Sequence, residues 1–130
     1  MSGTITGGDP LSSALLGVPA WTAMSLLNGW TNSGAGNVTA QWRKLNQSNE
    51  IEIIGTINAG TLTNGTNIAQ LTTYLPVTTQ FVPVMVTTST GSAGVTSPRL
   101  FIDTSGNVQV FSIPASTTAI SFHGTYSLDA

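Results

Sequence analysis

The segment from Pro98 to Ile113 limits the possible folds of this chain more than any other. Two runs rich in β-branched and aromatic residues flank the turn-forming residues Thr104, Ser105 and Gly106. Gly106 can adopt the positive φ that tight hairpin turns require, so the segment predicts a β-hairpin. Alternate side chains of a strand point to opposite faces, and both faces of this hairpin would carry apolar groups. A two-stranded ribbon cannot bury both, so it needs a second sheet, a neighbouring subunit, or both.

Other stretches follow the two-residue period of a β-strand, and almost none follows the period of a helix. In the clearest one, Ile120 to Leu128, apolar residues alternate with Ser, His and Thr, so the polar side chains should face solvent or a partner. Further strands are expected at residues 24–27, 38–43, 51–57 and 81–86. Short strands separated by turn signals predict an antiparallel β-sandwich of the jelly-roll type, with about seven or eight strands.

Two local features refine this prediction. Asn28-Gly29 is a dipeptide favoured in type I′ turns. Pro83 interrupts the apolar run from Phe81 to Val86 and has no N–H to donate to a ladder. We therefore expect an edge position or a bulge at Pro83.

The first twenty residues are expected to form an N-terminal arm or attachment segment, separate from the β-sandwich domain of residues 21–130. Met1 to Gly8 is rich in Gly, Thr and Ser, as extended linkers are. A short helix could follow, with Asp9 as its N-cap, Pro10 in its first turn and Gly17 at its end.

The composition excludes several classes of function. Only 6% of the residues are charged and 40% are apolar, the chain has three Lys and Arg, and its formal net charge is −2. Nucleic-acid binding is therefore not expected, because no basic surface can form. The apolar runs are shorter than the ~20 residues of a membrane span, so no membrane insertion is expected. The positive mean hydropathy of +0.21 favours oligomerisation, which hides apolar surface.

The inventory of reactive side chains is poor, and we expect no enzyme, no metal and no cofactor. His123 is the only histidine and there is no cysteine, so a metal site would lack ligands. Glu50 and Glu52 would share one strand face near Arg43, where a glycosidase pair is conceivable but solubilising charge is the favoured interpretation. Asp103 is expected to cap its own turn.

Three tryptophans could stack on sugars. Trp30 lies beside an Asn- and Gly-rich loop and is a better candidate than Trp21 or Trp42. Packing in the core or at an interface is the favoured alternative for each of them.

The order of the motifs resembles the C-terminal domain of phage minor tail and tail-fibre proteins. The motifs that carry the resemblance are Leu27–Asn32 (LNGWTN), Ala40–Lys44 (AQWRK), Ile51–Ile57 (IEIIGTI), Leu71 with Tyr74–Pro76, Leu100–Val108 (LFIDTSGNV) and Ile120–Tyr126 (ISFHGTY). The resemblance covers most of the chain from Trp21 onward.

The resemblance implies a homotrimeric β-sandwich knob on the surface of a virion, which is extracellular after release and attaches to a host-surface glycan receptor. The receptor contacts would involve Trp30, Asn32, Asn37 and Tyr74. The trimer interface would involve Phe81, Met85, Phe101 and Phe111. Residues 1–20 would bind other virion proteins.

Two alternatives remain open under this resemblance. No shaft, coiled coil or collagen-like repeat precedes the knob, so a capsid decoration protein whose N-terminal arm docks on the capsid is the second interpretation. A polysaccharide-degrading tail enzyme is the third, and the scarcity of paired acids and histidines disfavours it.

Overall fold

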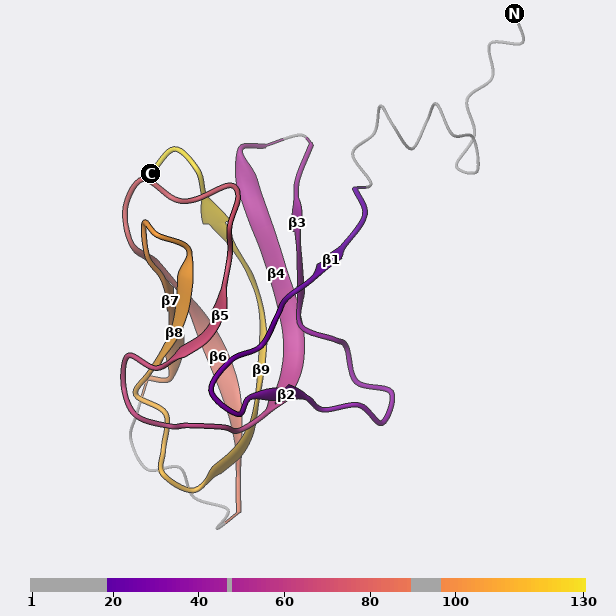
Figure 1. Ribbon diagram of the computed structural model, residues 1–130, viewed down its shortest axis with the longest axis vertical. Helices are drawn as coiled ribbons and strands as arrows, with labels where there is room; N and C mark the ends of the chain where they lie inside the picture. The colour runs from indigo at the N-terminus through magenta and orange to yellow at the C-terminus, as the bar shows by residue number, and fades with distance from the viewer. Residues whose placement is uncertain (1–18, 47, 90–96) are drawn as a thin grey trace, which may run out of the picture.

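The computed structural model describes residues 19–46, 48–89 and 97–130, and within them every regular element is a β-strand (Figure 1). The strands are β1 (Thr22–Ala23), β2 (Thr31–Asn32), β3 (Gln41–Lys44), β4 (Glu50–Asn58), β5 (Asn67–Gln70), β6 (Gln80–Thr88), β7 (Arg99–Ile102), β8 (Asn107–Phe111) and β9 (Thr117–Ser127). All pairings are antiparallel, which confirms the predicted fold class. None of these residues forms a helix that could cross a membrane. Of the arm expected in residues 1–20, residues 1–18, which include the expected helix, lie outside the described residues.

The strands follow the spatial order β1-β3-β4-β9-β6-β7-β8-β5, with β2 beside β4. The sheet bends at β6, because residues 80–83 of this strand pair with β7 whereas residues 84–88 pair with β9. Pro83 lies at the change of partner. An edge position or a bulge was expected at Pro83, and both expectations are wrong. Strand β6 lies inside the sheet, and the register shift of β6 lies at Thr87/Thr88 and not at Pro83. Pro83 is tolerated because the ladder to β9 begins only at the next residue, Val84.

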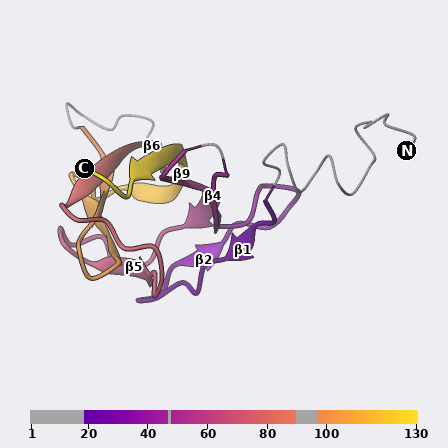
Figure 2. The same ribbon diagram turned by 90° about the horizontal axis from the view of Figure 1, so that it is seen from above.

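The two ends of the strand order meet, so the sheet curls around one core. Leu26, just after β1, forms a bridge with Ala69 of β5, and the N–H of Leu27 donates to the carbonyl of Ile68 at 2.8 Å. Figure 2 shows β5 across the molecule from β6 and β9. The strand expected at residues 24–27 is therefore reduced to one bridge. This closure pairs the edge of β5, which would otherwise be free.

The core is formed by the inward side chains of the long strands. On β4 the residues Ile51, Ile53 and Ile57 have no exposed surface, and they alternate with half-buried residues on the outer face. On β9 the inward position 124 is a glycine. A Cβ at Gly124 would lie 2.8 Å from Cγ1 of Val82 on β6. Gly124 therefore makes room for β6 where the sheet bends.

The local turn predictions agree with the structure. Gly106 has φ +86° between β7 and β8, and Asn28 and Gly29 both have positive φ, as a type I′ turn requires. Asp103 caps its turn, because its Oδ1 accepts the N–H groups of Ser105 and Asn107 at 2.9 and 3.0 Å. Burial tends to raise the pKa of Asp103, but the hydrogen bonds from Asn107, Ser105 and Gly106 outweigh it and hold the pKa below its ordinary value.

The strand expected at residues 38–43 begins only at Gln41. Its first residues are held by other hydrogen bonds: the N–H of Ala40 donates to Oδ1 of Asn32 at 2.9 Å, and the carbonyl of Val38 accepts from the N–H of Thr56 at 2.9 Å. The side chain of Asn32 thus replaces a ladder partner at the start of β3.

Candidate functional site

A trough lies on the outer face of the sheet, above the middle of β9. The floor is low because Ser121, on β9, and Thr56, on β4, have small side chains. Ile54 on β4 and Met85 on β6 rise on either side. Registers Thr56↔Ser121 and Met85↔Ser121 place these residues next to one another on three adjacent strands. The trough has a volume of about 370 Å³, which lies within the range of small-molecule sites.

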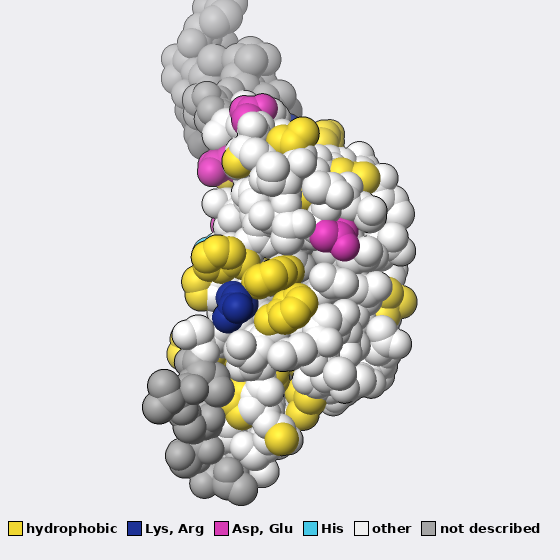
Figure 3. All heavy atoms as spheres, turned by 90° about the vertical axis from the view of Figure 1, so that its left-hand side faces the viewer, with side chains coloured by type: hydrophobic (Ala, Val, Ile, Leu, Met, Phe, Trp, Pro, Cys, Tyr) yellow, Lys and Arg dark blue, Asp and Glu magenta, His cyan; other side chains and the backbone are white. Residues whose placement is uncertain are grey.

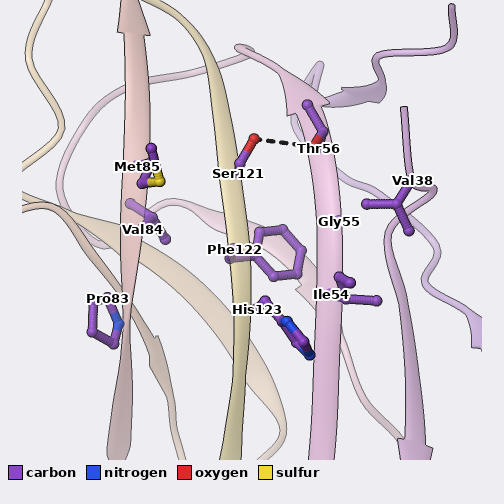
Figure 4. A pocket seen from close by; sticks show the side chains of 10 residues that line it. All are labelled: Val38, Ile54, Gly55, Thr56, Pro83, Val84, Met85, Ser121, Phe122 and His123. Carbon is purple, nitrogen blue, oxygen red and sulfur yellow. Dashed lines mark hydrogen bonds between the residues drawn. The ribbon is translucent and has the colours of Figure 1, made fainter. Parts of the chain in front are cut away.

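The trough combines apolar walls with a few polar groups. Oγ1 of Thr56 and Oγ of Ser121 are hydrogen-bonded at 3.0 Å across the floor, and each hydroxyl has further capacity to donate or accept (Figure 4). The complete lining is Val38, Ile54, Gly55, Thr56, Pro83, Val84, Met85, Ser121, Phe122 and His123. A ligand with both apolar faces and hydroxyl groups would match this lining.

A charged network borders the trough at His123. Nε2 of His123 lies 2.6 Å from Oε2 of Glu52, and Nε of Arg43 donates to Oε1 of Glu52 at 2.8 Å. The hydrogen bond with His123 is the strongest influence that holds the pKa of Glu52 below its ordinary value; burial opposes it, and Arg43 adds to the lowering. The Arg43 guanidinium also lies 4.1 Å from the ring centre of Trp21. The expected proximity of Arg43 and Glu52 is confirmed.

This network is not arranged as a metal site or as a glycosidase pair. Among the described residues, no three His, Cys, Asp or Glu side chains come together as a metal-ligand group. Glu52 is bonded to Arg43 and His123, while Oε1 of Glu50 accepts a hydrogen bond from Ser48 at 3.0 Å. Glu52 is therefore a charged hydrogen-bond partner at the border of the trough.

Trp30 does not lie where a ligand could reach it. Its side chain is 2% exposed, and its Nε1 donates to the carbonyl of Thr61 at 3.1 Å. Of the two interpretations of this tryptophan, the structure supports core packing. The assignment of Trp30 as a receptor contact is corrected for this reason.

Asn32, Asn37 and Tyr74 are exposed at the surface, but they do not form one site. Asn32 pairs with Ile57 near one end of β4. Tyr74 is attached near the other end, because its carbonyl accepts the hydroxyl of Tyr126, which pairs with Ile51. These two positions on β4 are about 20 Å apart at the usual rise of a strand. Asn37 directly precedes Val38, which lines the trough, but Asn37 is not itself part of the lining.

Tyr74 forms a second exposed feature with Trp42. The two rings meet edge to face with centroids 5.9 Å apart, and Tyr74 is 45% exposed. Tyr74 has φ 54°, which is unusual for an aromatic residue, and the hydroxyl of Tyr126 holds its carbonyl at 2.9 Å. The loop therefore presents the Tyr74 ring in a fixed position.

The four residues expected at a trimer interface lie on the outer face of β6, β7 and β8. The rings of Phe81 and Phe101 have centroids 6.2 Å apart, and those of Phe101 and Phe111 are 4.3 Å apart. Phe81 is 63% exposed and Met85 is 77% exposed. We call Phe81, Pro83, Met85, Phe101 and Phe111 the aromatic stripe. Figure 3 shows hydrophobic side chains gathered beside a basic one on this side of the molecule.

Several trough residues were not identified from the sequence. A signal was present at Ile54, the one apolar residue among the outward residues of its strand, between Glu52 and Thr56. Another was the row of Ser121 and His123 on the polar side of the last strand. Neither signal shows which strands are neighbours in the sheet. The trough is formed by residues of three adjacent strands, so it could not be identified from either signal.

No protein-family model matches the sequence, and a search of curated proteins finds no match. Among solved structures, the chain is similar to the crystal structure of the receptor binding protein (gp15) of Listeria phage PSA. The TM-score is 0.56 at 13% sequence identity, and the similarity covers 96% of this chain and 82% of that chain. At this identity, the similarity shows a shared fold.

Proposed function

We propose that this chain is a virion surface protein of a phage and acts in attachment to the host cell. The observation that carries the proposal is the fold shared with a phage receptor binding protein over 96% of the chain. The motif order from Leu27 to Tyr126, which resembles tail-fibre domains, supports it independently of the structure. Fold alone does not define function, so the ligand has to be argued from the surface.

The ligand proposed for the trough is a host-surface glycan. Sugar rings offer apolar C–H faces to side chains such as Ile54 and Met85, and hydroxyl groups to Ser121, Thr56 and His123. The floor and walls contain no group that demands a metal or a strongly charged ligand. A single trough of this kind would bind weakly, and many copies on one particle would raise the avidity.

Filling the trough tests the ligand proposal. Ser121→Leu adds bulk to the floor, and Thr87→Leu introduces the same side chain at an exposed position on the same face that does not line the trough. The purified proteins would be compared on a glycan array and for binding to host cells. We expect Ser121→Leu to lower binding at least roughly tenfold, or by about 1.4 kcal/mol. Equal binding by wild type and Ser121→Leu would exclude the trough as the receptor site.

Localisation on the particle tests the attachment role itself. An antibody against this chain should label the tail tip in electron micrographs of intact phage. Labelling over the whole capsid would contradict the attachment proposal and would support the decoration role instead.

A further inference from the structure

His123 borders the trough with one of its two ring nitrogens engaged. Nε2 of His123 lies 2.6 Å from Oε2 of Glu52, whereas no residue in the described part of the chain forms a hydrogen bond with Nδ1. The side chain is 60% exposed, and it lies beside Ile54, with which His123 pairs across β9 and β4 (Figure 4). Nδ1 is therefore the polar atom that this ring offers to a ligand.

Glu52 determines whether Nδ1 donates or accepts. In a neutral imidazole one nitrogen carries the proton and the other is an acceptor. Glu52 is ionised at neutral pH, because its pKa is held below the ordinary value of 4.5, chiefly by the hydrogen bond with His123. An ionised carboxylate can only accept, so the proton lies on Nε2. Nδ1 of neutral His123 is consequently an acceptor.

The surroundings of Nδ1 favour an amide as the group that binds there. An amide N–H can only donate and gains from a fixed acceptor, whereas a carboxylate, which can only accept, is repelled. Ser121 lies two residues from His123 on the same face of β9, about 7 Å away at the usual rise of a strand. Two hydrogen bonds of about 2.9 Å with an amide group between them span roughly this distance.

We propose that the trough recognises the acetamido group of an N-acetylated sugar, and that Glu52 is the positioning residue that keeps Nδ1 of His123 as its acceptor. The amide N–H donates to Nδ1, the amide carbonyl accepts from the hydroxyl of Ser121, and the methyl group contacts Ile54, all of which line or border the trough. This inference rests on the proposed function of the trough and narrows its ligand from a glycan to this class of sugar.

Arg43 makes Glu52→Gln a sharp test of this inference. Nε of Arg43 donates to Oε1 of residue 52 at 2.8 Å, and an arginine can only donate. A glutamine at position 52 would therefore turn its carbonyl oxygen to Arg43 and its amide N–H to His123. The proton of the neutral ring would then move to Nδ1, which becomes a donor. Glu50→Gln is the matched control, because it removes the same charge from the same strand and Glu50 is bonded to Ser48 instead.

Protonation of His123 should have the same effect on Nδ1, because a charged imidazole donates from both nitrogens. The charged side chains on the outer face of the surrounding strands are Glu50 and Glu52 of β4, Arg43 of β3 and Arg99 of β7, and β6, which carries Pro83 of the aromatic stripe, has none. Arginine keeps its charge throughout, and Glu52 is still ionised at pH 5. Histidine changes its charge between about pH 5 and 8, so binding measured over this range reports on His123.

NMR of the only histidine tests the positioning step without any ligand. Long-range correlation of the ring protons with nitrogen-15, in a chain prepared without a histidine tag, distinguishes a protonated ring nitrogen from an unprotonated one. At about pH 8 we expect an unprotonated Nδ1 in wild type and Glu50→Gln, and an unprotonated Nε2 in Glu52→Gln. The same tautomer in wild type and Glu52→Gln would overturn the positioning role of Glu52.

Binding of matched sugars tests the ligand class. N-acetylglucosamine and glucose differ only in an acetamido group in place of a hydroxyl, as do N-acetylgalactosamine and galactose. We expect wild type and Glu50→Gln to prefer one of the acetamido sugars at least roughly tenfold at about pH 8, and to lose most of this preference at about pH 5. Glu52→Gln should lack the preference at both pH values.

Two kinds of failure are distinguishable in this experiment. If wild type binds glycans but has no preference for an acetamido sugar, or if Glu52→Gln keeps the preference of wild type, the inference drawn from His123 is overturned and the trough remains a glycan site. If wild type binds no glycan at any pH, the proposed function of the trough is overturned, and this inference with it.

Discussion

Gly124 and Val82 approach each other closely, so the effect of Gly124→Ala on stability should depend on which side chain is present at position 82. Alanine in a strand is more favourable than glycine by about 0.5–1 kcal/mol. In this protein, however, the new Cβ would lie 2.8 Å from Cγ1 of Val82, whose side chain is 1% exposed. Overpacking of a core costs about 1–3 kcal/mol. Gly124→Ala alone should therefore lower the free energy of unfolding by about 1 kcal/mol.

In the Val82→Ala background, the effect of Gly124→Ala on the free energy of unfolding should change sign. Val82→Ala removes two methyl groups, which costs about 2 kcal/mol including the cavity. It also removes the atom that the new Cβ would meet, since the Cβ of Val82 itself is 3.7 Å away, at ordinary contact distance. In the Val82→Ala background, Gly124→Ala should then raise the free energy of unfolding by about 1 kcal/mol, through strand propensity and partial filling of the cavity. The coupling between the two substitutions is about 2 kcal/mol.

Urea unfolding of the four proteins measures this coupling. With a slope of about 1–3 kcal/mol per molar, each step of 1 kcal/mol moves the midpoint by roughly 0.5 M. The slopes should stay equal, so that the midpoints can be compared. If Gly124→Ala changes stability by the same amount and sign in both backgrounds, Val82 does not cross β9 at Gly124, and our account of the bend in β6 is refuted.

Three further predictions concern single hydrogen-bonding groups. The folded protein lowers the pKa of Glu52, so ionised Glu52 stabilises the fold above pH 4.5, and this stabilisation is lost as the pH falls through the lower, folded pKa. Below pH 4.5, the urea midpoint should therefore fall more steeply in wild type than in Glu52→Gln. Parallel pH profiles of the two proteins would contradict this prediction. Burial raises the pKa of Tyr126, so its hydroxyl stays protonated and donates to Tyr74; Tyr126→Phe should lose about 1 kcal/mol in urea unfolding, and no loss would show that this bond is not needed. Asp103→Ala removes the acceptor of the β7–β8 turn and should lower stability by about 1–2 kcal/mol, whereas a neutral result would mean that Gly106 alone fixes the turn.

The strands and turns were largely predictable from the sequence, because both depend on neighbouring residues. The positive φ of Gly106 and of Asn28-Gly29 follows from local backbone energetics. The Arg43–Glu52 ion pair follows from the short connection between β3 and β4, which sets their antiparallel register. The predicted strand boundaries were less accurate where a side chain took the place of a neighbouring strand as hydrogen-bond partner, as Asn32 does at the start of β3.

The candidate site was not predictable in the same way. Trp30 lies beside a polar loop in the sequence, which suggested a surface position, yet the curled sheet encloses its ring. The trough requires Ile54, Ser121 and Met85 from three strands, and their proximity depends on which strands pair. Sequence periodicity contains no information on that order, because non-local pairing is decided by the packing of the whole core.

By itself, the sequence determined that this chain forms an antiparallel β-fold, since alternating apolar residues and turn signals permit little else. It also showed that both faces of the strands at residues 81–86 and 99–111 are apolar. Only the tertiary structure decided which face became the core. Leu100 and Val110 turned inward and Phe101 and Phe111 outward, because β6 changes partner at Pro83 and bends the sheet around one side. When both faces of a strand are apolar, the two-residue period of its sequence does not show which face will be buried. The direction in which the sheet curls decides this, because the inner face becomes the core.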